Sequence, residues 1–162
     1  MILYHGSNQA VSEPQLIEQT RGLDFGAGFY LTSNEKQAIQ FSEIVKNRQK
    51  SGIPTVTVYD FDIEKAESVL SILRFESAND VWLRFVADNR LKIYDGPFYD
   101  MVIGAVANDK VMPTIQAYLG GFLNEEATII TLKTSKLANQ YCLKSAEALS
   151  ILKFVDSYES KE

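Results

Sequence analysis

The sequence predicts an α+β fold in a single domain spanning residues 1–162, with a small, mostly antiparallel sheet and helices packed around it. Strand-like and helix-like segments follow one another without the regular alternation of a doubly wound fold. No Gly-x-Gly-x-x-Gly fingerprint opens a helix after a strand. A chain of 162 residues, 46% of them hydrophobic and 23% charged, has the length and composition to bury one core.

The first half of the chain predicts three strands and two helices. The strands are expected at residues 2–4, 29–32 and 55–61, and the helices at residues 34–50 and 63–73. β-branched and aromatic residues predict the third strand. Ser33 or Asn34 caps the first helix. Its apolar face is formed by Ala38, Ile39, Phe41, Ile44 and Val45.

The second half predicts four helices, two strands and an edge strand. Helices are expected at residues 81–91, from 108 or 109 to about 120, from 124 onward and at 145–152; strands are expected at 99–106, 139–143 and 154–155. Asn79 or Asp80, Asn108 or Asp109, and Asn124 are the expected caps. The polar residues 156–162 are expected to form a frayed tail.

Composition and charge limit the functional classes. The formal net charge is −5, so no overall basic field attracts nucleic acid. The single cysteine, Cys142, excludes an intrachain disulfide and fits the cytoplasm. The N-terminus lacks the basic and apolar regions of a signal peptide, and no apolar run is long enough to span a bilayer. We therefore expect a cytoplasmic protein without membrane partners.

His5 is the only histidine in the chain. One histidine and one cysteine are too few for an ordinary closed zinc site, so no metal is expected. The chain also lacks a phosphate-binding loop, a Cys-x2-Cys pair and a Gly-x-Ser-x-Gly elbow. By itself, His5 is most simply a satisfied polar residue at the end of a strand.

Three stretches together resemble the ADP-ribosyltransferase superfamily, in particular its diphtheria-toxin and poly(ADP-ribose)-polymerase branch. Tyr4-His5-Gly6-Ser7 is similar to the histidine motif on that branch's first strand. Phe25-Gly26-Ala27-Gly28-Phe29-Tyr30-Leu31 is similar to its Phe-Gly-Lys-Gly-Ile-Tyr-Phe stretch, and Leu137-Ala138-Asn139-Gln140-Tyr141 to its Asn-Glu-Tyr strand. Their order is the family's order. The whole chain also resembles a small bacterial domain family of uncharacterised function within this superfamily, whose members are often proposed as toxins of toxin–antitoxin pairs.

The resemblance implies a split antiparallel sheet, NAD as co-substrate and a catalytic triad of His5, Tyr30 and Gln140. His5 would bind the adenosine-side ribose, while the backbone of Gly6 and the side chain of Ser7 would bind the nicotinamide amide. Tyr30 and Phe41 would stack on the nicotinamide ring. Glycines allow close backbone approach to a flat ligand. The implied NAD-binding residues are therefore His5, Gly6, Ser7, Gly28, Tyr30 and Phe41.

Gln140 departs from the family pattern, because the catalytic position normally holds glutamate. A glutamine accepts a hydrogen bond from a ribose hydroxyl, but it cannot offer negative charge to an oxocarbenium ion or act as a base. The leading interpretation is a mono-ADP-ribosyltransferase, with an acceptor still to be identified and an antitoxin as a possible partner. The alternatives are a catalytically silent module that binds NAD or ADP-ribose and, ranked last because the arginines are not clustered in the sequence, a 2′-phosphotransferase.

Overall fold

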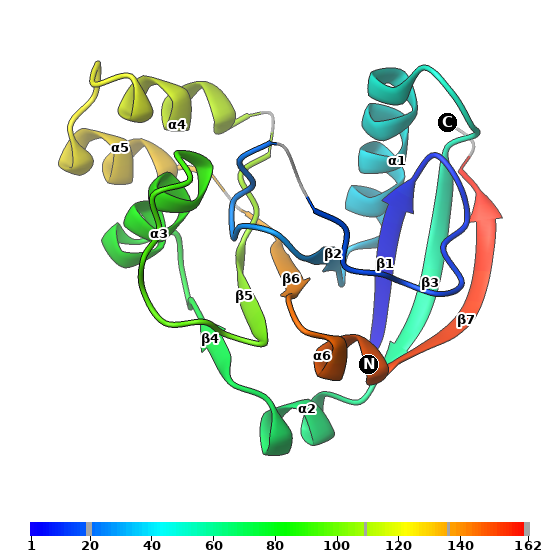
Figure 1. Ribbon diagram of the computed structural model, residues 1–162. Coiled ribbons are helices and arrows are strands. Elements are labelled where there is room, and N and C mark those ends of the chain that lie inside the picture. Colours follow the sequence, from blue (N-terminus) through cyan, green and yellow to red (C-terminus); the bar gives the residue numbers. More distant parts are fainter. Residues whose placement is uncertain (19–20, 109, 136, 161–162) are drawn as a thin grey trace.

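The computed structural model describes residues 1–18, 21–108, 110–135 and 137–160, and it confirms the α+β class (Figure 1). The described residues form one seven-stranded sheet, in the order β4-β5-β6-β2-β1-β3-β7, and six helices. Neighbouring strands are antiparallel except for the parallel pair β4 and β5. The strands are β1 (Ile2–Ser7), β2 (Phe29–Thr32), β3 (Thr55–Phe61), β4 (Ile72–Arg74), β5 (Met101–Ala105), β6 (Asn139–Leu143) and β7 (Leu152–Glu159). The helices are α1 (Glu35–Gln49), α2 (Ile63–Val69), α3 (Asp80–Arg90), α4 (Met112–Leu119), α5 (Glu125–Leu132) and α6 (Ala146–Ser150).

Near its middle, between β1 and β2, the sheet has the fewest paired residues. These strands share one residue pair, Tyr4 with Thr32, whereas β1 pairs with β3 along its whole length. Figure 1 shows β1, β3, β7 and α1 on one side of this join, and β4, β5, β6 and helices α3–α5 on the other. Among the described residues, β1 beyond this single pair therefore has a sheet neighbour on its β3 side only.

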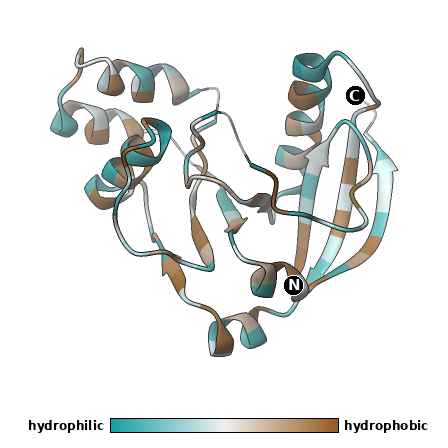
Figure 2. Cartoon of the chain, in the orientation of Figure 1, coloured by the Kyte–Doolittle hydropathy of each residue, from teal (hydrophilic) through white to brown (hydrophobic). Residues whose placement is uncertain are grey.

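Hydrophobic residues cover both faces of the sheet, because side chains alternate along each strand. In β2, Phe29 and Leu31 enter one core cluster, whereas Tyr30 packs against a second. The first cluster lies against α2 and α6, and the second lies against α3 and α4. Trp82 of α3, fully buried, donates its indole N–H to the carbonyl of Ala105 over 3.0 Å. Figure 2 shows hydrophobic stretches on the strands of both halves.

Two predicted helices need correction. The helix expected at 63–73 ends at Val69, and Ile72–Arg74 instead form β4, which pairs in parallel with β5. In α1 the fully covered positions are Ala38 and Ser42, while Phe41 of the expected apolar face is exposed. The reason is that α1 packs so closely on β1 that only small side chains fit between them.

The caps and the C-terminal end were predicted with mixed success. Asn34, Asn79 and Asn124 cap α1, α3 and α5 as expected. α4 begins after Val111 without a side-chain cap, so Asn108 is not its cap, and Asp109 lies outside the described residues.

The tail expected to fray from Asp156 continues instead as β7. Its residues up to Glu159 pair with β3, and the buried Ser160 hydroxyl lies 2.8 Å from that of Ser42.

Candidate functional site

The three sequence motifs lie on three adjacent strands at the centre of the sheet. Tyr4 to Ser7 belong to β1, Phe29 to Thr32 belong to β2, and Asn139 to Leu143 form β6. The sheet order β6-β2-β1 makes these strands direct neighbours, although β1 and β6 are more than 100 positions apart in the sequence. The strand register then decides which side chains share a face.

His5 spans the join between β1 and β2. Its Nδ1 lies 2.7 Å from the carbonyl oxygen of Tyr30, and its ring stacks on Phe29 at 4.2 Å between centroids. Because a carbonyl only accepts, Nδ1 carries the proton, and Nε2 of the neutral ring is an acceptor. Burial lowers the pKa of His5, and the bond to Tyr30 only partly opposes this effect. The side chain is therefore a neutral acceptor at pH 7.

Tyr30 points to the other face of the sheet and holds the glycine stretch. Its hydroxyl donates to the carbonyl of Gly26 over 2.5 Å and accepts from the backbone N–H of Phe25 over 3.0 Å. Burial, with a smaller contribution from nearby Cys142, raises the pKa of the phenol well above its ordinary value. Tyr30 thus stays neutral, and its ring lies 6.4 Å from that of Phe25.

Gln140 belongs to a buried polar network that the sequence did not predict. Its Nε2 donates to Oδ2 of Asp24 over 3.0 Å and to the carbonyl of Ala105 over 3.4 Å. Asp24 also accepts from the backbone N–H of Ala107 over 3.3 Å, and its other oxygen lies 2.5 Å from a terminal guanidinium nitrogen of Arg90. Asp24 and Gln140 are each only 6% exposed. Within the described residues no donor reaches Oε1 of Gln140, which leaves this oxygen as the open acceptor of the network.

The proposed triad is divided between the two faces of the sheet. Thr32 pairs with both Tyr4 and Gln140, so these side chains share a face with Tyr30. His5 follows Tyr4 along β1 and points the other way, toward Phe29. The structure thus brings Tyr30 and Gln140 to one face, and brings His5 to the β1–β2 join from the other.

The remaining predicted NAD-binding residues lie around β1 and α1. Gly6 is buried beneath α1, because a Cβ at this position would lie 2.1 Å from the carbonyl oxygen of Ala38. Ser7 is half-buried, and its hydroxyl donates to Asn8 over 3.3 Å. Phe41 projects from α1 with 42% of its surface exposed.

The glycine stretch is packed tightly against β6. Gly26 has a positive φ of 78°, which favours glycine. A Cβ on Gly28 would lie 2.4 Å from the sulfur of Cys142. The close backbone approach at this glycine is therefore to Cys142 of β6 and not to a ligand. Lys144 adds a clamp, because its Nζ donates to the carbonyls of Phe25 over 2.6 Å and Ala27 over 2.7 Å. Burial lowers the pKa of this amine.

A family model described as "Protein of unknown function (DUF3990)" matches residues 1–154. The chain belongs to this family. No curated protein and no solved structure matches it.

The DUF3990 chain presents hydrogen-bond acceptors rather than a nucleophile at the centre of its sheet. Burial raises the pKa of the Cys142 thiol to about 12, so this sulfur is an inert part of the core. Within the described ranges, no three side chains from His, Cys, Asp and Glu gather as metal ligands, and no helix is long and apolar enough to cross a membrane. Nε2 of His5, Oε1 of Gln140 and the edge of β1 suit a ligand rich in hydroxyl and amide groups.

Asp24, Arg90 and Lys144 are the site residues that sequence reasoning missed. Asp24 directly precedes the glycine stretch, and this position is the one signal in the sequence that points to it. Arg90 ends α3 and Lys144 follows β6, and nothing in their local pattern distinguishes them from solvated surface cations.

Proposed function

We propose that this protein binds NAD at the join between β1 and β2 and is a mono-ADP-ribosyltransferase. One observation carries the proposal: three motifs in the order of the ADP-ribosyltransferase superfamily fall on adjacent strands, beside a join of one residue pair. The narrow join supports the split sheet that the resemblance implies. Within the described part of the chain it also leaves the β2 side of residues 5–7 without a strand partner, so the sheet does not use their backbone groups on that side.

The proposal assigns chemistry to the residues at the join. Nε2 of His5 accepts from a ribose hydroxyl, and the backbone of Gly6 binds the nicotinamide amide with help from Ser7. The exposed ring of Phe41 offers a stacking face to the cationic nicotinamide. Gln140 accepts from the other ribose through Oε1. Tyr30 contributes mainly by shaping the glycine stretch, since its hydroxyl is already used there.

A second candidate, a silent module that binds NAD or ADP-ribose, is favoured by the Gln140 network. Breaking the bond between nicotinamide and ribose develops positive charge on the sugar, which a nearby carboxylate stabilises. The one carboxylate in this network, Asp24, already accepts from Arg90, Gln140 and Ala107. A neutral amide facing the sugar supports binding more readily than bond cleavage.

Calorimetry with NAD, together with an assay of nicotinamide release, tests both candidates. We expect His5→Ala and Phe41→Ala to weaken NAD binding, His5→Ala by about 0.5–1.5 kcal/mol for one lost hydrogen bond. Phe122→Ala is the matched control for Phe41→Ala, because Phe122 is 87% exposed between α4 and α5. A folded sample that binds no NAD at millimolar concentration excludes both candidates.

Acceptor and partner are tested separately. Incubation with labelled NAD and cell lysate, followed by protease or nuclease, shows whether the acceptor is protein, nucleic acid or a small molecule. The resemblance to toxin families and the single buried cysteine lead us to propose a cytoplasmic enzyme with an antitoxin partner. Binding without labelling of any acceptor, and without nicotinamide release, would favour the silent module.

A further inference from the structure

Two cavities form a continuous groove along the glycine stretch, away from the join of β1 and β2. The larger has a volume of about 460 Å³ and the smaller about 250 Å³. Among the described residues, Gly26, Ala27, Asn89 and Tyr94 line both cavities. The larger volume lies within the range of about 300–1,000 Å³ typical of small-molecule sites.

The larger cavity is mainly apolar and rich in aromatic rings. Phe85 and Tyr94 meet edge to face at 5.0 Å, and Phe98 lies on the outer wall with 65% of its surface exposed. Ile17, from the segment that precedes the glycine stretch, also lines this cavity and is 68% exposed. Such a surface suits a flat ring, which gains from stacking on aromatic side chains.

The smaller cavity is cationic. Arg21 and Lys92 line it, and Lys144 lines the larger one, whereas Glu18 is the only acidic side chain among the described residues that line either cavity. This local excess of positive charge contrasts with the net charge of −5 for the whole chain. Burial lowers the pKa of Arg48, and the charge of nearby Arg21 lowers it further. In the described part of the chain, Arg21 forms no ion pair with an acidic side chain. Arg48 lines neither cavity, whereas Arg21 is exposed and lines the smaller one, where its guanidinium can bind an anion such as a phosphate.

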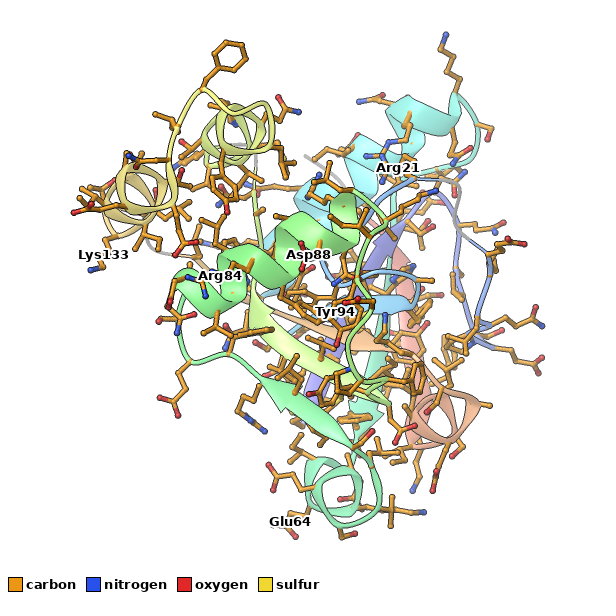
Figure 3. All side chains as sticks on the ribbon, turned by 60° about the vertical axis from the view of Figure 1, so that its left-hand side comes forward. Arg21, Glu64, Arg84, Asp88, Tyr94 and Lys133 are labelled. Atoms are coloured by element: carbon orange, nitrogen blue, oxygen red, sulfur yellow. The ribbon has the colours of Figure 1, made fainter. Side chains whose placement is uncertain are left out.

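Asn89 lies where the two halves meet. Its Nδ2 donates to the carbonyl of Phe85 over 2.9 Å, which fixes the amide and turns Oδ1 toward Gly26. Figure 3 shows Tyr94 alongside α3 and Arg21 near the end of that helix. The backbone agrees, because Gly22, next to Arg21, packs on the carbonyl of Arg90 at the end of α3.

We propose that this groove binds a nucleotide-class ligand, that is, an aromatic base joined to a phosphate. The base would lie against Tyr94 and Phe98, with Oδ1 of Asn89 accepting from a ring or exocyclic N–H. The phosphate would lie at Arg21. Charge complementarity selects the phosphate, and the aromatic wall selects the base.

The groove is separate from the proposed NAD site. Of the residues expected to bind NAD, Gly28 lines the larger cavity, whereas His5, Gly6, Ser7, Tyr30, Phe41 and Gln140 line neither. The two sites share only the glycine stretch, so the inference does not depend on the proposed function.

Titration calorimetry with AMP, adenosine and ribose 5-phosphate tests the inference. We expect AMP to bind at least tenfold more tightly than either fragment, because only AMP reaches both halves. Arg21→Ala and Phe98→Ala should each weaken AMP binding by threefold or more. The controls are Arg74→Ala, an exposed arginine on β4, and Phe122→Ala, and both should bind AMP as the parent does.

Three outcomes would overturn the inference: no AMP binding by folded protein at millimolar concentration, binding that neither Arg21→Ala nor Phe98→Ala changes, or binding that His5→Ala weakens as much as Arg21→Ala. The last result would put AMP in the proposed NAD site. Conversely, loss of NAD binding in His5→Ala with intact AMP binding would establish two sites. AMP binding by a protein that binds no NAD would support the groove and exclude the proposed function.

Discussion

Replacing Gln140 by glutamate tests the buried network and the enzyme hypothesis together. The two side chains match in size, so the perturbation is electrostatic. The amide nitrogen that now donates to Asp24 over 3.0 Å becomes an oxygen facing another oxygen. Arg90 already neutralises Asp24, so no cation among the described contacts of this pair is left to compensate a second carboxylate.

The magnitude follows from two competing costs. Two ionised carboxylates about 3 Å apart repel by about 5 kcal/mol at an effective dielectric constant of about 20. Protonating a carboxyl of ordinary pKa about 4.3 at pH 7 costs about 4 kcal/mol, at about 1.4 kcal/mol per pH unit. Protonation is the cheaper course, and it restores a hydrogen bond to Asp24. We therefore expect Gln140→Glu to lose about 2–4 kcal/mol of unfolding free energy at pH 7.

The loss depends on pH in a defined direction. The pKa of the new carboxyl is raised in the folded state, so folding keeps a proton that the unfolded chain releases above about pH 4.3. The stabilisation from this proton is complete below that value and is lost as the pH rises toward the folded-state pKa. The variant should approach the parent near pH 5 and fall behind it by up to about 1.4 kcal/mol for each added pH unit.

Urea unfolding from pH 5 to pH 8 measures this effect. The control is Gln40→Glu, at an exposed position of α1, which should stay within about 0.5 kcal/mol of the parent. Adding Asp24→Asn to Gln140→Glu removes the repulsion and lets the new carboxylate ionise. The double variant should recover stability relative to the sum of the single changes. Equal and pH-independent stabilities of Gln140→Glu and Gln40→Glu would refute the reasoning.

Three further predictions concern the surrounding residues. Gly6→Ala should cost about 1–3 kcal/mol in thermal unfolding, because its Cβ meets the Ala38 carbonyl at 2.1 Å; an unchanged melting temperature would mean that α1 shifts freely. The parent should lose stability as the pH falls below about 6.5, because burial lowers the pKa of His5 in the folded state and the unfolded chain takes up the proton first. His5→Gln should reduce this loss. The same acid sensitivity in both proteins, measured by urea unfolding, would contradict this. Lys144→Met should loosen residues 25–28, which faster hydrogen exchange of their amides would report and unchanged exchange would exclude.

Local patterns predicted most of the fold because their physical causes are local. The β-branched run Thr55–Phe61 is a strand with the expected bounds. Asn34, Asn79 and Asn124 cap helices, because an asparagine side chain accepts from the free N–H groups in the first turn of a helix. β4 was missed because three residues carry little pattern, and a distant parallel partner, β5, decides their conformation.

The candidate site was only partly predictable because strand register is a non-local property. The motifs named the right strands, but a shift of one residue along a strand moves a side chain to the opposite face. His5 and Gln140 differ in this way, and no sequence feature shows it. The network of Asp24, Arg90 and Gln140 joins positions 66 and 116 residues apart, and single polar residues at such separations carry no periodic signal.

Under the proposed function, NAD binding and NAD cleavage would depend on different residues. The binding groups proposed at β1 do not contact Asp24, so changes at His5 should alter affinity without disturbing the buried charges. Cleavage depends instead on whether negative charge faces the sugar. In the parent, Asp24 forms an ion pair with Arg90, and the side chain of Gln140 carries no charge. In Gln140→Glu alone the new carboxyl keeps its proton at pH 7, so cleavage should rise little. In the double variant with Asp24→Asn it ionises, and nicotinamide release should rise about tenfold for each 1.4 kcal/mol of transition-state stabilisation. A double variant that folds and binds NAD but releases nicotinamide no faster than the parent would place the reaction centre away from Gln140.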